Sequence, residues 1–237
     1  MLESMALFLD IDGTLLTFAD TPREVRVDKP LVALLSELSR RTTGALAFVS
    51  GRSVASIDSL FHPLRLPAAG LHGFERRGAD GQLRRHPYPP AAKLATARVA
   101  MRALAAFDPG LQLEDKGLLL ALHYRRAPRL GVHVLEAMEQ IAMEAGPELV
   151  LQPGNCVVEL HPRGVSKGAA IDEFMQEAPF RGRRPVYVGD DLTDESGFES
   201  VNRAGGRSIL VGERQPTVAR DRLPDTGAVR SWLQSIL

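Results

Sequence analysis

Two aspartates separated by one residue follow a short apolar run near the start of the chain, in the segment Asp10-Ile11-Asp12-Gly13-Thr14. The run 6–9 is typical of a buried strand, and open parallel sheets bind their ligands at the carboxyl ends of strands. Two carboxylates at such a place repel each other unless a cation or phosphoryl chemistry uses them. We therefore interpret Asp10 as a nucleophile and Asp12 as a general acid that later acts as a general base. The alternative is a solvated acidic turn.

A second acidic segment, Gly189 to Glu195, follows the apolar run 186–188. Holding its carboxylates together at a strand end is unfavourable without a cation. Oxygen ligands of this kind suit Mg2+, which also binds substrate phosphate. We expect a magnesium site, and the alternative is a surface acidic turn that caps the next helix. The candidate metal ligands of the two segments are Asp10, Asp12, Asp190, Asp191 and Asp194.

Candidate phosphate-binding groups come from the first acidic turn and from two other segments. The backbone amides at Gly13 and Thr14 can face anionic oxygens. Ser50, in Ser50-Gly51-Arg52 after the apolar run 45–49, can donate its hydroxyl to a phosphoryl oxygen. Lys167 begins an expected helix, where a cation is unfavourable unless an anion lies nearby. The alternatives are that Ser50 caps a helix and that Lys167 is a solvated surface lysine.

The elements that must position these residues alternate between strand and helix. Short apolar runs at 6–9, 45–49 and 67–71 are separated by helical spacing, with Asp28 and Ser53 as N-caps. The same alternation resumes after Ser166, with strands at 186–188 and 208–211 and a closing helix at 228–237. This order predicts an α/β fold with a parallel, Rossmann-like sheet covered by helices on both faces.

Residues 82–162 have a different pattern, and we predict a small inserted domain there. Helical spacing, two strands, helical spacing and two further strands give the order α-β-β-α-β-β. We expect a four-stranded, mostly antiparallel sheet with two helices on its apolar face. Residues 1–81 and 163–237 then form the core domain. Alternation along the strands puts His123, Arg125, Glu159 and His161 on the opposite, mixed face, which is free to cover a ligand.

Composition narrows the class of protein. The 237 residues carry 29 basic and 29 acidic side chains, so the net charge is zero, and aromatic residues make up 5%. Nucleic-acid and membrane-surface binding therefore lack electrostatic support. One cysteine, no signal-peptide pattern and no long apolar run lead us to expect a cytoplasmic protein without disulfides. The six histidines show no zinc-ligand spacing, and P-loop and Gly-x-Ser-x-Gly motifs are absent.

The four chemical segments, in this order, resemble the motifs of the haloacid dehalogenase-like (HAD) phosphohydrolases, and the long insertion resembles a C2-type cap. The chain is also similar to the trehalose-6-phosphate phosphatases, in Gly70 to Glu75, in Lys116-Gly117 with 121–125, in 154–168 and in 188–195. The resemblance implies Mg2+-dependent hydrolysis of a sugar phosphate through an aspartyl-phosphate. The metal would be held by the Asp10 carboxylate, the Asp12 main-chain carbonyl and Asp190, with Asp191 and Asp194 at its edge.

The resemblance also implies binding residues. The phosphate-binding set is Gly13, Thr14, Ser50, Gly51 and Lys167. Lys116 and Glu159 would hold trehalose hydroxyls, and the other implied substrate-binding residues are His72, Glu75, His123 and Arg125. Asn155 and His161 depart from the family pattern, which usually has a basic residue at each position.

Two other functions remain open, namely a phosphatase of another sugar phosphate such as sucrose 6-phosphate, and a non-catalytic sugar-phosphate sensor. The small-molecule substrate is the only direct partner expected. We expect a monomer, with a functional but not necessarily physical link to a trehalose-6-phosphate synthase.

Overall fold

The structure is a computed structural model of the chain, and it describes residues 2–17, 26–86, 91–115, 117, 119–154 and 156–237. These residues divide into two compact units, one of residues 1–85 with 166–237 and one of residues 86–165. We call them the core unit and the inserted unit. Within the described residues, none of the helices combines the length and the apolar character needed to cross a bilayer.

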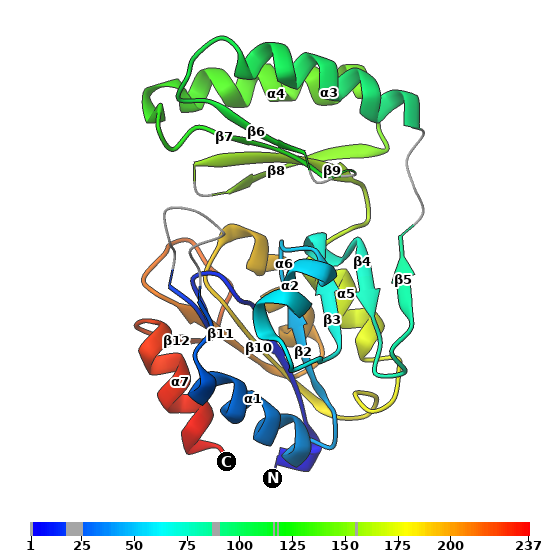
Figure 1. Cartoon of the computed structure of the whole chain (residues 1–237), viewed down its shortest axis with the longest axis vertical. Helices are drawn as coiled ribbons and strands as arrows, with labels where there is room; N and C mark the ends of the chain where they lie inside the picture. The colour runs from blue at the N-terminus through cyan, green and yellow to red at the C-terminus, as the bar shows by residue number, and fades with distance from the viewer. Residues whose placement is uncertain (1, 18–25, 87–90, 116, 118, 155) are drawn as a thin grey trace. The chain divides into compact units, whose positions relative to one another are not determined.

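The core unit is built on an eight-stranded sheet in the order β12-β11-β10-β1-β2-β3-β4-β5 (Figure 1). The strands from β12 to β3 pair in parallel, and β4 and β5 continue the sheet in antiparallel pairing. The strands are β1 (Met5–Leu9), β2 (Leu46–Val49), β3 (Ala68–Gly70), β4 (Glu75–Arg77), β5 (Leu83–Arg85), β10 (Arg184–Gly189), β11 (Arg207–Val211) and β12 (Asp221–Leu223). The predicted parallel α/β core is confirmed.

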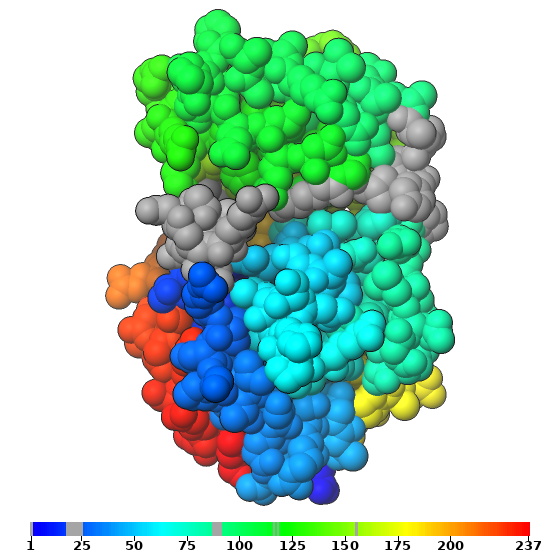
Figure 2. Space-filling view, in the orientation of Figure 1, coloured from blue at the N-terminus to red at the C-terminus, as the bar shows by residue number. Residues whose placement is uncertain are grey.

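Helices cover both faces of this sheet because its strands are apolar on both sides. In β1, Leu7 and Leu9 pack on the side of α1, α2 and α7, while Ala6 and Phe8 pack on the side of α5 and α6. The helices are α1 (Lys29–Arg41), α2 (Val54–Phe61), α5 (Lys167–Phe174), α6 (Glu195–Arg203) and α7 (Thr226–Ser235), with the 3-10 turns η1 (Leu2–Ser4), η2 (Leu71–Gly73) and η4 (Leu192–Asp194). The first and last helices, α1 and α7, lie side by side on the surface (Figure 1 and Figure 2).

The predicted helix starts are confirmed by their caps. Asp28 Oδ1 accepts a hydrogen bond from the Leu31 amide at 2.8 Å, and Ser53 Oγ accepts one from the Ser56 amide at 3.2 Å. Such caps satisfy backbone N–H groups that have no partner inside the helix.

The hairpin of β4 and β5 corrects one expectation. We assigned residues from 82 onward to the insertion, but 83–85 form the edge strand of the core sheet. The segment 75–77 reads as polar because it contains Glu75, Arg76 and Arg77. All three side chains are buried. Arg76 forms ion pairs with Glu173 in α5 and with Glu177 just after it, and Arg77 forms one with Asp58 in α2.

The inserted unit has the predicted order and an antiparallel sheet, β6-β7-β9-β8. Its elements are α3 (Ala91–Ala105), β6 (Gln112–Asp115), β7 (Leu120–His123), η3 (Pro128–Leu130), α4 (Gly131–Ala145), β8 (Leu149–Gly154) and β9 (Val157–Pro162). Both helices lie on one face of the sheet (Figure 1). Leu120, Leu122, Val158 and Leu160 pack against them, as the alternation predicted.

Candidate active site

Three neighbouring strands bring the candidate residues together at one edge of the core sheet. Asp10 follows β1, Ser50 follows β2, and Asp190 follows β10. The order β10-β1-β2 places the three strand ends side by side, and all three strands run in parallel. The predicted meeting of the acidic segments at this edge is therefore a consequence of the sheet order.

A buried lysine joins the first and second acidic segments. Lys167 Nζ donates to Asp10 Oδ1 at 2.8 Å and to Asp194 Oδ1 at 2.6 Å, and all three side chains are buried. Lys167 occupies the first turn of α5, after the N-cap Ser166. Burial alone would lower the pKa of Lys167, but the two carboxylates outweigh it and raise the pKa above its ordinary value. This lysine is an ammonium ion locked between carboxylates and not a solvated surface residue.

Asp194 is the anchor of this arrangement. Its Oδ1 also accepts a hydrogen bond from the Tyr187 hydroxyl. Its Oδ2 accepts from the backbone amides of Asp190 and Asp191, each at 2.9 Å. Burial would raise the pKa of Asp194, but Lys167 and these hydrogen bonds hold it below its usual value. With both oxygens occupied, Asp194 fixes Lys167 and the backbone of the acidic turn at once.

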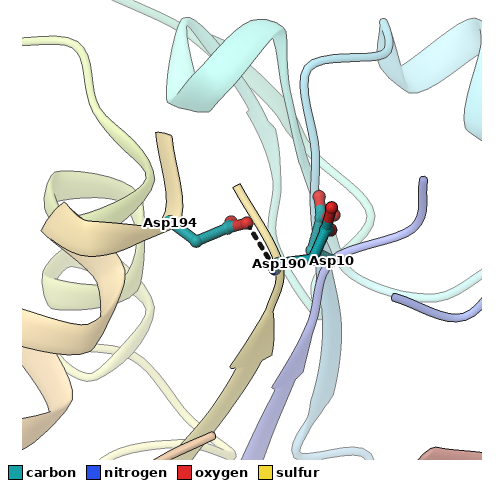
Figure 3. A group of neighbouring side chains, drawn as sticks. All are labelled: Asp10, Asp190 and Asp194. Carbon is teal, nitrogen blue, oxygen red and sulfur yellow. Dashed lines mark hydrogen bonds between the residues drawn. The ribbon is translucent and has the colours of Figure 1, made fainter. Parts of the chain in front are cut away.

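Asp10 and Asp190 project together beyond the ends of their strands (Figure 3). Asp194 enters from the side and directs its carboxylate to the backbone of Asp190 (Figure 3). Carboxylate oxygens of the three residues lie within 4.8 Å of one another. Asp190 Oδ1 also accepts a hydrogen bond from Thr14 Oγ1 at 2.8 Å.

The electrostatics of this group fit a divalent cation. Burial and then the neighbouring carboxylates raise the pKa of Asp190, and burial likewise raises the pKa of Asp10 despite its contact with Lys167. Both shifts mean that the folded chain disfavours two adjacent negative charges in a region that excludes water. A hard cation with oxygen ligands would remove this penalty, and Mg2+ has that preference.

The other two predicted metal residues use their carboxylates elsewhere. Asp191 Oδ1 accepts from the Leu192 amide at 2.7 Å and so caps η4. Both oxygens of Asp12 accept from Arg52, from Nε and from Nη2, each at 2.6 Å.

The turn around Gly13 differs from the expected phosphate cradle. The Gly13 amide donates to the Leu16 carbonyl at 2.7 Å, and the Thr14 amide donates to the Ile11 carbonyl at 3.4 Å. Because these bonds close the turn on itself, neither amide is available to a phosphate in this arrangement. Gly13 has another role: its φ is +84°, and an added Cβ would lie 2.1 Å from Asp190 Oδ2. Glycine is required here so that the two acidic segments can approach.

The segment after β2 is the remaining phosphate-binding candidate. Ser50 is buried at the strand end, and its Oγ accepts from the Arg52 amide at 3.2 Å, which leaves the hydroxyl proton for another acceptor. A Cβ on Gly51 would lie 2.7 Å from His72 Nε2, so the imidazole packs directly over this glycine. His72 itself has a left-handed backbone, with φ +56°.

The remaining predicted substrate-binding residues are spread over both units. Glu75 Oε1 accepts from the Val54 amide at 2.6 Å, so in the core unit this carboxylate holds the start of α2. In the inserted unit, Glu159 lies opposite Ala121 on the mixed face of the sheet, and His123 Nε2 is 3.0 Å from Glu114 Oε2. Arg125 is exposed. Lys116 and Asn155 lie outside the described residues.

Reasoning from the sequence missed two residues of the site. Arg52 follows Ser50-Gly51, but nothing in the spacing indicates that it reaches Asp12, 40 positions earlier. Tyr187 lies in the apolar run of β10, where its type reads as a core residue. Alternation in β10 does put Tyr187 on the face covered by α6, which was the available signal.

Comparison with known proteins identifies the family. The trehalose-phosphatase family model matches residues 8–225. The chain is 46% identical over 231 residues to the trehalose-6-phosphate phosphatase of Escherichia coli K12, covering 98% of this chain and 86% of the relative. It is 42% identical to a probable trehalose-phosphate phosphatase of Sinorhizobium fredii, covering 99% of this chain and 88% of the relative.

Solved structures agree on the fold. The C-terminal domain of the C. albicans trehalose-6-phosphate phosphatase superposes with a TM-score of 0.87, at 21% identity, over 99% of this chain and 92% of that one. Other structural neighbours include HAD-superfamily phosphatases. The chain belongs to the trehalose-phosphatase family and is a phosphoric monoester hydrolase.

Proposed function

We propose that this chain hydrolyses trehalose 6-phosphate to trehalose and phosphate, with Asp10 as the nucleophile. The observation that carries the proposal is the state of the Asp10 carboxylate. Lys167 holds Oδ1 at 2.8 Å, and no hydrogen bond engages Oδ2 within the described part of the chain. The substrate is supported by the near-full-length similarity to the E. coli trehalose-6-phosphate phosphatase.

In the first half-reaction, Asp10 Oδ2 forms a bond to phosphorus and the bond from phosphorus to the sugar oxygen breaks. The leaving oxygen takes a proton from Asp12, so that trehalose departs as an alcohol and an aspartyl-phosphate remains. Lys167 and the Ser50 hydroxyl stabilise the charge on the transferring phosphoryl group.

In the second half-reaction, Asp12 takes a proton from a water molecule. The water oxygen bonds to phosphorus, and the bond from phosphorus to Asp10 breaks, returning its electron pair to the carboxylate. Lys167 donates a hydrogen bond to the departing carboxylate and so stabilises its negative charge.

The Asp10 and Asp190 carboxylates and the Asp12 main-chain carbonyl would hold Mg2+, supported from the edge by Asp191 and Asp194. Bound there, the cation supplies neutralisation of charge on the phosphoryl oxygens. The mutual repulsion of the carboxylates supports this assignment, because a divalent cation offsets it. Asp194 acts through its grip on the Asp190 and Asp191 amides.

Recognition of the sugar is assigned to the inserted unit. The mixed face of its sheet carries Glu159, which the family resemblance assigns to trehalose hydroxyls together with Lys116. His123 and Arg125, and His72 and Glu75 of the core unit, complete the proposed set. We further propose that the enzyme is a cytoplasmic monomer and that a trehalose-6-phosphate synthase supplies its substrate.

The first test is phosphate release from trehalose 6-phosphate, glucose 6-phosphate and sucrose 6-phosphate, each with Mg2+ and with EDTA. We expect Mg2+-dependent activity with a strong preference for the trehalose ester. Asp10→Asn should abolish turnover while leaving the circular dichroism spectrum unchanged. Equal activity on all three esters would refute the substrate assignment, and turnover by the Asn variant would refute the nucleophile.

A second test separates sugar recognition from chemistry. Glu159→Ala should raise KM for trehalose 6-phosphate far more than KM for a small aryl phosphate. Glu136→Ala removes an exposed carboxylate from the outer helix α4 and serves as the matched control. Equal effects of Glu159→Ala on both substrates would exclude Glu159 from sugar binding.

A further inference from the structure

The Asp12 carboxylate is held by one side chain. Arg52 donates from Nε to Oδ2 and from Nη2 to Oδ1, each at 2.6 Å. Among the described residues, no other group donates a hydrogen bond to this carboxylate. The Arg52 and Asp12 side chains are 13% and 29% exposed, so the contact is shielded from most solvent. A guanidinium fork that binds both oxygens fixes the plane of a carboxylate as well as its distance.

The backbone of Arg52 is fixed in turn. Its amide donates to Ser50 Oγ at 3.2 Å, and its carbonyl accepts from the Leu71 amide at 2.9 Å. The next residue, Ser53, is the N-cap of α2. Arg52 therefore extends from a rigid turn at the end of β2 to the turn that follows β1.

The geometry suits Asp12 as a general base, which is the second of the two tasks proposed for it. The hydrogen bonds to its oxygens within the described residues both come from the Arg52 donors, so the carboxylate is arranged as an acceptor. An ionised carboxylate has about four lone-pair sites, and the fork occupies two of them. The remaining sites can accept a hydrogen bond from a water molecule without breaking the contact with Arg52.

We propose that Arg52 is a positioning residue that orients Asp12 for the hydrolysis of the aspartyl-phosphate. The inference rests on the proposed function of Asp10 and Asp12. In this step the proton of the water moves to Asp12, the water oxygen bonds to phosphorus, and the phosphorus–Asp10 bond breaks. Arg52 makes no bond to the reacting atoms and acts through the orientation of Asp12.

The test uses p-nitrophenyl phosphate, whose leaving group departs without a proton. Formation of the aspartyl-phosphate then does not need Asp12, whereas its hydrolysis does. In rapid-mixing experiments with Mg2+, Arg52→Ala should release close to one p-nitrophenolate per enzyme at the wild-type rate. Its steady-state rate should then fall by about 100-fold, the loss typical of a misplaced reacting group. Phosphoenzyme should accumulate in acid-quenched samples.

Three further variants make the outcome decisive. Arg52→Lys keeps the charge but cannot bind both oxygens, so it should restore only part of the rate. In an Asp12→Asn background, Arg52→Ala should cause no additional loss, because the residue acts through Asp12. Arg40→Ala removes another fork contact, with Glu37 on the exposed surface of α1, and should match the wild type.

Two results would overturn the proposal. A slower burst or a higher KM in Arg52→Ala would mean that Arg52 binds the substrate phosphate directly. An additive loss in the double variant would mean that it acts independently of Asp12. If Arg52→Ala does not fold, Arg52→Lys decides the question. Wild-type steady-state turnover in Arg52→Lys would show that binding of both Asp12 oxygens is not needed, and would refute the proposal. Failure of the wild-type protein to hydrolyse either phosphate ester would instead refute the proposed function itself.

Discussion

Replacing Asp190 by asparagine should stabilise the protein when no divalent cation is present. Carboxylate oxygens of Asp190, Asp10 and Asp194 lie within 4.8 Å of one another. Two unit charges at that separation repel by about 3 kcal/mol at an effective dielectric constant of about 20. Attraction to Lys167 offsets part of this repulsion, so we expect Asp190→Asn to raise the free energy of unfolding by about 1–2 kcal/mol in EDTA. The Thr14 hydrogen bond survives because an amide oxygen also accepts it.

The raised pKa of Asp190 also predicts how the stability difference between the wild type and the variant changes with pH. Burial and the neighbouring carboxylates raise the pKa of Asp190 from 3.8 to about 9. Between these values the folded state binds more protons than the unfolded state, so stability in EDTA falls as the pH rises. The stability of the wild-type protein should therefore decrease between pH 5 and pH 9, and that of Asp190→Asn should decrease less. The advantage of the variant should grow with pH.

Urea unfolding followed by circular dichroism measures both effects. Saturating Mg2+ should make the wild type more stable than Asp190→Asn, because a ligand at 100 times its dissociation constant stabilises the protein that binds it by about 2.7 kcal/mol. The variant should respond much less. Asp225→Asn is the matched control: the Asp225 carboxylate lies outside the acidic cluster and caps α7 by accepting from the Ala228 amide at 2.8 Å, and an amide oxygen keeps that bond. The reasoning is refuted if Asp190→Asn is no more stable than the wild type in EDTA at pH 8 and keeps the full response to Mg2+.

Three other substitutions test the groups around this site. Lys167→Met should destabilise the protein by about 3–5 kcal/mol in urea unfolding, because it leaves buried carboxylates without a cation; a loss below 1 kcal/mol would contradict the charge network. Tyr187→Phe should cost about 1–2 kcal/mol in thermal unfolding, with turnover within a few-fold of wild type, since Asp194 keeps its bonds to Lys167 and to two amides. Gly13→Ala should abolish the rise in Tm on adding Mg2+, because its Cβ would lie 2.1 Å from Asp190 Oδ2; an unchanged rise would show that the turn can move.

Apolar periodicity predicted those parts of the fold in which burial follows from residue type. The strands β1 and β2 and the stretch 186–188 of β10 are continuous apolar runs, and the helix caps Asp28 and Ser53 have a local signature. The edge strands escaped prediction because their residues are charged. Arg76 and Arg77 are buried in β4 only because acidic residues far along the chain pair with them, and that pairing has no local signal.

The same distinction applies to the candidate site. The position of Asp10 and Asp190 at neighbouring strand ends follows from the order of a parallel sheet, which strand–helix alternation predicts. The contacts of each carboxylate do not follow from it. Arg52 reaches Asp12 and Tyr187 reaches Asp194 through tertiary packing, and the Gly13 amide is used inside its own turn. The sequence therefore predicted which segments meet, and the structure was needed to assign the hydrogen-bond partner of each carboxylate.

Charge balance links the metal site to the order of binding. At the strand ends, the Asp10, Asp190 and Asp194 carboxyls share one ammonium, that of Lys167, so ionisation of all three would leave two negative charges uncompensated. The adjacent Asp12 and Arg52 form a neutral pair and do not alter this balance. A phosphate ester brings two more negative charges into the same buried region, and one lysine cannot offset them. A divalent cation would cancel the residual charge, so we expect it to bind before or together with the substrate. Substrate binding measured in EDTA should accordingly be much weaker than in Mg2+, even for a variant that cannot turn the ester over.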